Sequence, residues 1–186
     1  MSAAIMLRAA LSLLWVAINS SPVDRIRANN ILVVPGKGAE SILLGDGVDE
    51  VLFVKGHPDR VVEIGGIKDL LKDIFRLVSD IRICYDRIYY FETKGLIVFI
   101  EKGVVVAIAG LNNNRVTNDS VSLAKGADYF LFSYGNKDLN VLVNGDNRLY
   151  LYPKLGIAVA DDKCDDIVDM YIVFPEQREA GTRRER

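Results

Sequence analysis

From residue 82 to residue 174 the chain contains many short runs rich in apolar and aromatic residues, separated by turn residues. Runs of this length between turn residues are typical of β-strands. We therefore expect strands at about 82–92, 95–101, 104–110, 139–143, 147–152, 156–160 and 167–174. A shorter run at 60–64 indicates another strand, and Glu101, Lys102 and Gly103 predict a hairpin turn between two of the strands.

Helical spacing of apolar residues predicts short helices at about 47–55 and 126–134, and a longer one at 67–81. In the first, Asp46 is placed to cap the helix N-terminus and Gly56 to end it. Its buried stripe comprises Val48, Val51, Leu52 and the stem of Lys55.

The stretch 42–56 aligns without a gap on 121–135. Six identical positions carry this match, namely Leu44, Gly47, Asp49, Leu52, Phe53 and Gly56 against Leu123, Gly126, Asp128, Leu131, Phe132 and Gly135. A second match sets 87–98 against 148–159. Such self-similarity predicts an internal duplication.

The duplication predicts an α+β fold of two tandem modules, each a short helix or helix pair packed on an antiparallel β-sheet. The modules cover 31–111, with the helix 67–81 as an insertion, and 116–175. Residues 176–186 carry mixed charges and are expected to be a disordered tail.

Residues 1–21 stand apart from both modules. Arg8 precedes an apolar run at 9–18, and small polar residues follow it. This order is typical of a signal peptide, so we expect a periplasmic or secreted protein. The alternative is a retained hydrophobic N-terminal helix in a cytoplasmic protein. The run is too short for a stable membrane span.

Composition narrows the possible functions. Half of the residues are hydrophobic and 26% are charged, which suffices for a folded core. A formal net charge of -2 gives no support for binding nucleic acid. One histidine and two cysteines offer no metal set, so we predict no catalytic residues, metal or cofactor. Pairing of Cys84 with Cys164 stays open.

Acidic residues cluster near the C-terminal end, at Asp161, Asp162, Asp165, Asp166 and Asp169. Their spacing departs from a calcium-binding loop. A solvated loop is therefore expected, with a weak cation site as the alternative.

Pro35, Gly36 and Gly38, then a short helix containing Asp49, Glu50 and Val51, and then Gly95 with an apolar strand form a recognisable pattern. It resembles the small SmpA/OmlA (BamE-like) envelope modules, and the doubled form is similar to the beta-lactamase inhibitory proteins. This resemblance implies an exported, non-catalytic protein that acts by protein contact.

Two strands of the predicted modules repeat an arginine and two aromatic residues on one face. These are Arg87, Tyr89 and Phe91 in the first module and Arg148, Tyr150 and Tyr152 in the second. Arginine and aromatic side chains often anchor protein interfaces. The face could bind a protein partner, or other parts of the fold could cover it.

The leading hypothesis is therefore a non-catalytic, exported protein-binding or envelope-assembly module that acts through a sheet face. A cytoplasmic interaction or scaffold domain and a small hydrolase with a carboxylate pair are the alternatives. The sequence predicts neither the oligomeric state nor the identity of the partner.

Overall fold

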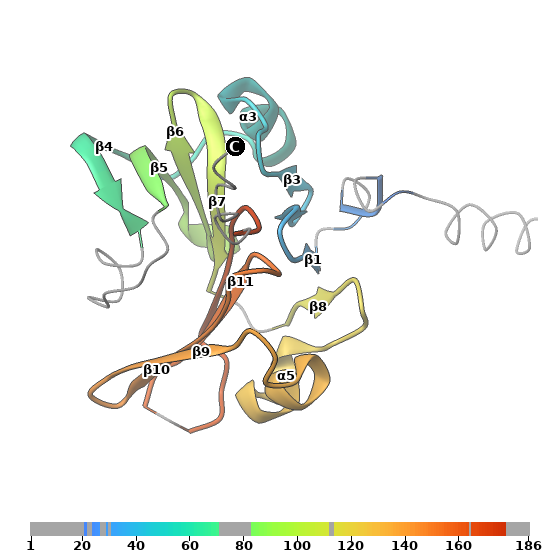
Figure 1. The fold of residues 1–186 in the computed structure, drawn as a ribbon. Coiled ribbons are helices and arrows are strands. Elements are labelled where there is room, and N and C mark those ends of the chain that lie inside the picture. Colours follow the sequence, from blue (N-terminus) through green and yellow to red (C-terminus); the bar gives the residue numbers. More distant parts are fainter. Residues whose placement is uncertain are drawn as a thin grey trace, which may run out of the picture.

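A computed structural model shows a mainly β protein built on two sheets (Figure 1). It describes residues 21, 24–26, 29, 31–70, 83–111, 114–163 and 165–177. All of the predicted N-terminal segment (1–21) except Ser21, and residues 178–186 of the charged tail, lie outside these residues.

The large sheet is antiparallel and has eight strands in the order β4-β5-β6-β7-β12-β11-β10-β9. Its strands are β4 (Arg60–Asp69), β5 (Cys84–Phe91), β6 (Leu96–Glu101), β7 (Val104–Gly110), β9 (Asn140–Asn144), β10 (Asn147–Tyr152), β11 (Ile157–Asp161) and β12 (Met170–Val173). The strands predicted from these apolar runs are confirmed to within a few residues at their ends. The runs located them because a strand that is buried on both faces has a nearly continuous apolar sequence.

The small sheet has four short strands in the order β3-β2-β1-β8. They are β1 (Leu32–Val34), β2 (Gly38–Ala39), β3 (Ile42–Leu43) and β8 (Val116–Thr117). The helices α3 (Val48–Lys55) and α5 (Ala127–Tyr134) have eight residues each, and η1 (Glu92–Lys94) and η2 (Leu123–Lys125) are single 3-10 turns. The small sheet, α3 and α5 lie on the same side of the large sheet (Figure 1).

The predicted fold class, two tandem modules that each pack helices on their own sheet, is wrong. The last strand of one half, β7, pairs with the last strand of the other, β12. Both halves therefore contribute to one continuous sheet, and strands dominate the described part of the chain. Local periodicity cannot reveal this pairing, because it joins strands that are distant in sequence.

The two halves nevertheless present their elements in the same order. α3 precedes β4, β5, β6 and β7, and α5 precedes β9, β10, β11 and β12. At the centre, Ala109 pairs with Ile172, and Gly110 and Ile108 pair with Tyr171 and Val173 on either side. The duplication itself stays a prediction.

Both helices predicted from the repeat are confirmed, with one difference at a cap. Gly47 is the N-cap of α3 and provides no side-chain hydrogen bond. The Asp46 carboxylate instead accepts a 2.8 Å hydrogen bond from the Leu43 backbone N–H. Gly56 ends the helix as expected, with a φ of 77°.

The predicted helix at 67–81 is wrong at its start, because residues 67–69 belong to β4. Residues 71–82 lie outside the described part of the chain. The apolar spacing used for that prediction therefore did not locate the helix N-terminus.

Both faces of the large sheet are buried over its central strands, whereas the edge strand β9 is largely exposed. One face packs beneath α3, α5 and the small sheet, and includes Tyr89, Val98, Ile108 and Val159. The opposite face packs with Leu70 and Ile83, and its members include Ile88, Phe99, Leu149, Leu151 and Ile172. A sheet covered on both faces leaves its edges and the covering elements to meet other molecules.

Candidate anion-binding cleft

A buried carboxylate, that of Glu40, is held by three side chains from distant parts of the chain. Its Oε1 accepts hydrogen bonds from Tyr171 Oη at 2.7 Å and from Arg115 Nε at 2.8 Å. Lys55 Nζ lies 3.8 Å from Oε2. The Glu40 residue is 2% exposed, so these partners take the place of its water shell.

The fold brings the four residues together at the junction of the two sheets. Glu40 lies in the tight turn between β2 and β3, where it and Ser41 have φ values of 52° and 68°. Lys55 ends α3, Arg115 directly precedes β8, and Tyr171 lies on β12. Positive φ is costly for these residue types, and so the surrounding contacts must hold the turn in place.

Burial shifts the pKa values of two groups in this cluster. It lowers the pKa of Lys55, against the opposing attraction of Glu40. Burial, followed by the negative charge of Glu40, raises the pKa of Tyr171 well above 10. The phenol of Tyr171 therefore stays protonated at neutral pH and can donate to the carboxylate.

An open cleft of about 410 Å³ borders this cluster. It is lined by Ile31, Glu40, Val54, Lys55, Lys94 and Arg115. Lys94 comes from η1, is exposed, and donates a hydrogen bond to the backbone carbonyl of Lys55. The lining of the cleft therefore contains two aliphatic side chains, three basic groups and one carboxylate.

This arrangement favours an anionic group. Basic side chains outnumber the carboxylate three to one in the lining. A partly desolvated site strengthens the attraction between a bound anion and these cations, relative to the same charges in water. The volume suits one or two residues of a peptide or a small organic acid.

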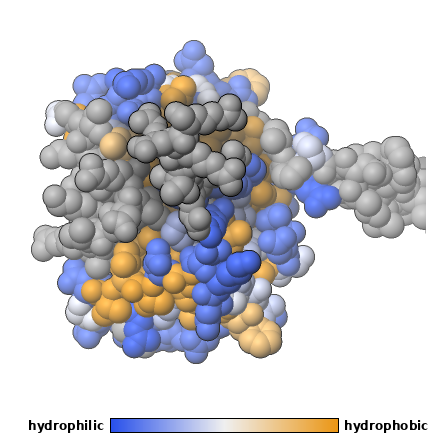
Figure 2. Space-filling view, viewed as in Figure 1, coloured by the Kyte–Doolittle hydropathy of each residue, from blue (hydrophilic) through white to orange (hydrophobic). Residues whose placement is uncertain are grey.

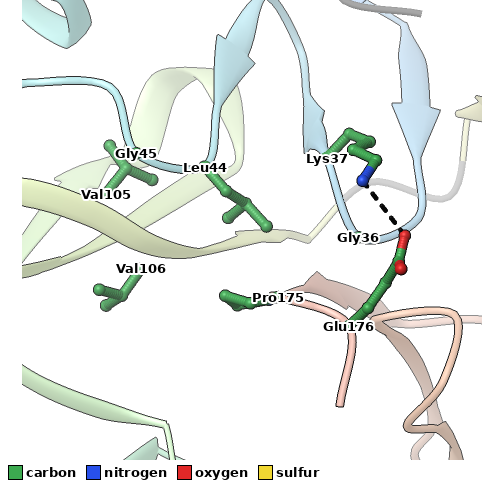
Figure 3. A pocket seen from close by; sticks show the side chains of 8 residues that line it. All are labelled: Gly36, Lys37, Leu44, Gly45, Val105, Val106, Pro175 and Glu176. Carbon is green, nitrogen blue, oxygen red and sulfur yellow. Dashed lines mark ion pairs between the residues drawn. The ribbon is translucent and has the colours of Figure 1, made fainter. Parts of the chain in front are cut away.

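A second cleft, of about 430 Å³, lies between the turn before β2, β7 and the segment that follows β12 (Figure 3). Leu44, Val105, Val106 and Pro175 provide apolar lining. Lys37 is the sole basic side chain among the described residues of that lining, and its Nζ lies 3.3 Å from Glu176 Oε1. With one basic side chain against one carboxylate, this cleft offers weaker attraction to an anion than the first.

The aromatic residues predicted to form an open binding face are buried in the core. Tyr89, Phe91, Tyr150 and Tyr152 are at most 6% exposed, and all four belong to the cluster beneath α3 and α5. A partner could not contact them on this surface. The alternative, in which other parts of the fold cover this face, therefore holds for these four residues.

The two arginines of the predicted face lie outside that core. Arg87 pairs with Glu63 at 3.3 Å across β5 and β4, while its buried Nε has no hydrogen-bond partner in the part of the chain that the structure describes. Arg148 is exposed near the tip of the β9–β10 hairpin. They lie in different halves of the sheet, and neither belongs to the described lining of the cleft that Lys55 and Arg115 share.

The acidic cluster makes hydrogen bonds within its own loop and to α5. Asp169 accepts from the Asp162 backbone N–H at 2.6 Å, and Asp161 accepts from that of Asp165 at 3.1 Å. Asp166 accepts from the backbone N–H of Asp128 at 2.6 Å, in the first turn of α5. Among the described residues, no cluster of three acidic, histidine or cysteine side chains could hold a metal.

Sequence reasoning did not find the cleft. The hydrogen bonds to Glu40 join residues 75 and 131 positions apart. No spacing rule connects such positions. A weak signal was present at Lys55, a basic residue on the apolar stripe of its helix, which indicates a buried charge that needs a partner.

No family model matches the chain, and neither does any curated protein or solved structure. The resemblance to SmpA/OmlA modules therefore stays a prediction. None of the described helices is both long and apolar enough to cross a membrane.

Proposed function

We propose that this protein is a non-catalytic protein-binding module, and that the cleft beside Glu40 binds the C-terminal carboxylate of a partner chain. The observation that carries the proposal is the convergence of Lys55, Lys94 and Arg115 on one open cleft. Capture of a terminal carboxylate is a recurring mode of peptide recognition.

The lining supports an apolar residue next to the carboxylate. Ile31 is 47% exposed and Val54 is half-buried, so each can contact an aliphatic side chain. Arg115 is already oriented by Glu40, which reduces the ordering cost when an anion approaches. Lys94 is the most accessible of the three basic groups and provides the most direct contact to a ligand.

The test is a calorimetric titration with a hexapeptide that ends in leucine, compared with its C-terminal amide. We expect the free acid to bind at least about tenfold more tightly, which corresponds to about 1.4 kcal/mol. Lys94→Met should remove most of that difference. Lys102→Met is the matched control, because Lys102 is exposed in the β6–β7 turn, away from the cleft lining.

Equal affinities for acid and amide would refute the proposal. The proposed function also includes export of the protein, which is a separate claim and rests on the apolar run at 9–18. Intact-mass measurement of the native protein tests that part, since cleavage should remove about twenty residues. A full-length mass would instead support a cytoplasmic interaction domain.

A further inference from the structure

The open edge of β9 has a palindromic sequence. Its five residues read Asn140, Val141, Leu142, Val143 and Asn144, so the strand is identical in both directions about Leu142. β9 is the last strand of the large sheet, and no described strand pairs with its outer edge. We propose that this edge pairs with β9 of a second copy of the chain and forms a twofold-symmetric dimer.

The hydrogen-bonding pattern fits that pairing. A two-residue loop, Gly145 and Asp146, joins β9 to β10. In such hairpins the residues flanking the loop exchange hydrogen bonds, and every second pair beyond them does the same. The pairs Asn144 with Asn147 and Leu142 with Leu149 therefore bond within the sheet. The backbone groups of Val141 and Val143 face the open edge.

A twofold axis through Leu142 places Val141 of one copy opposite Val143 of the other. Both residues present outward N–H and C=O groups, so each such pair can exchange two hydrogen bonds, and the dimer has two such pairs. The same axis places the Val141 side chain of one copy next to the Val143 side chain of the other. An isologous contact requires this self-complementarity, which a palindromic strand supplies directly.

The two edges of the large sheet differ in how well they are protected against pairing with a strand of another molecule. β4, at the opposite edge, carries Arg60 and Glu63, and its pairing with β5 is irregular between Glu63 and Lys68. Charges and irregular pairing are the usual means of blocking edge association. β9 contains no charged residue and no proline, and Val141 and Val143 are 48% and 58% exposed.

The surface around the β9–β10 hairpin agrees with an unprotected edge at β9. In Figure 2, apolar surface lies over the part of the molecule where β9 and β10 run in Figure 1. A contact of one short strand per copy is smaller than the roughly 1,200 Å² of a standard interface. We therefore expect a weak dimer that forms at high micromolar protein concentration.

Analytical ultracentrifugation of the full chain over a concentration series tests the proposal. Val141→Lys should raise the dimer dissociation constant at least about tenfold, because it places charge on the edge. Val143→Pro should act similarly, since it removes an outward N–H while sparing the bonds to β10. Val61→Lys on β4 is the matched control, and should leave dimerisation unchanged.

Disulfide trapping tests the register independently of these variants. In a chain with Cys84→Ser and Cys164→Ser, Leu142→Cys places two thiols on the axis, at a separation suited to a disulfide. Val143→Cys shifts them off the axis and should cross-link far less. A chain that stays monomeric at high micromolar concentration, a dimer that Val141→Lys does not weaken, or equal trapping of both cysteine variants would overturn the proposal.

Discussion

Tyr171 donates a 2.7 Å hydrogen bond to Glu40, a residue 131 positions earlier in the chain. This bond joins β12 of the large sheet to the turn between β2 and β3 of the small sheet. It fixes the carboxylate that in turn orients Arg115. The relation between these two residues therefore connects the core of the fold to the cleft.

Tyr171→Phe should lower the free energy of unfolding by about 1.5–3 kcal/mol, because it removes a buried hydrogen bond to a charged group. Urea unfolding monitored by circular dichroism measures this change. Tyr90→Phe is the control, since the ring of Tyr90 lies beneath Arg60 and, among the described residues, its hydroxyl makes no hydrogen bond to a carboxylate. A cost of under about 0.5 kcal/mol for Tyr171→Phe would contradict the bond's importance.

Glu40→Gln should destabilise the protein by about 3–5 kcal/mol, because Lys55 and Arg115 would then lack their buried counter-charge. Glu92→Gln removes an exposed carboxylate that pairs with Arg60 at 3.3 Å, and should cost about 0–1 kcal/mol. Parallel urea titrations compare the two variants. Similar losses in the free energy of unfolding would show that the buried cluster stabilises the fold no more than a surface ion pair does.

Alkaline titration should separate the buried tyrosines from the exposed ones. Burial raises the pKa of Tyr134 to about 12 and that of Tyr171 well above 10. A phenol whose folded pKa is raised stabilises the fold fully below pH 10, and this stability is lost as pH rises through the folded pKa. Absorbance at 295 nm should show tyrosines that ionise late, together with unfolding.

The lowered pKa of Lys55 acts in the opposite direction, since it makes stability rise with pH until the unfolded value of 10.5 is reached. Stability should therefore rise as pH increases from the lowered pKa of Lys55 towards pH 10, and fall above pH 10 as the tyrosines ionise. In Tyr171→Phe the late absorbance change should be smaller. Ionisation of every tyrosine in one step near pH 10, without unfolding, would argue against their burial.

Two phenylalanines on α5 should respond differently to truncation. Phe130 is 0% exposed and packs against Tyr134 and Tyr152, with ring centroids 4.8 and 5.7 Å away. Phe130→Ala should cost about 3–5 kcal/mol. Phe132 is 87% exposed, so Phe132→Ala should change stability by less than about 0.5 kcal/mol in thermal melts. Equal losses of stability in the two variants would mean that α5 packs on the core through another of its faces.

Sequence patterns predicted the local elements well. Short apolar runs between turn residues located β7 and β10, and helical spacing with flanking glycines located α3 and α5. These signals depend on neighbouring residues, whose spacing reflects backbone geometry.

The assembly of those elements could not be predicted in the same way. Tyr89 and Ile88 point to opposite faces of β5, and both are buried because each face of the sheet is covered. Alternation separates two faces but does not say which one stays open. The cleft depends on Glu40, Arg115 and Tyr171, whose contacts arise when the two sheets pack together.

The most direct test of the proposed function is a double-mutant cycle on the cleft. It measures the dissociation constants of the wild-type protein and of Lys94→Met for the free-acid and amide forms of the leucine-ended peptide. If Lys94 contacts the carboxylate, the preference for the acid should fall from at least about tenfold to near unity. An undiminished preference in Lys94→Met, or no preference in the wild-type protein, would contradict a carboxylate-binding cleft.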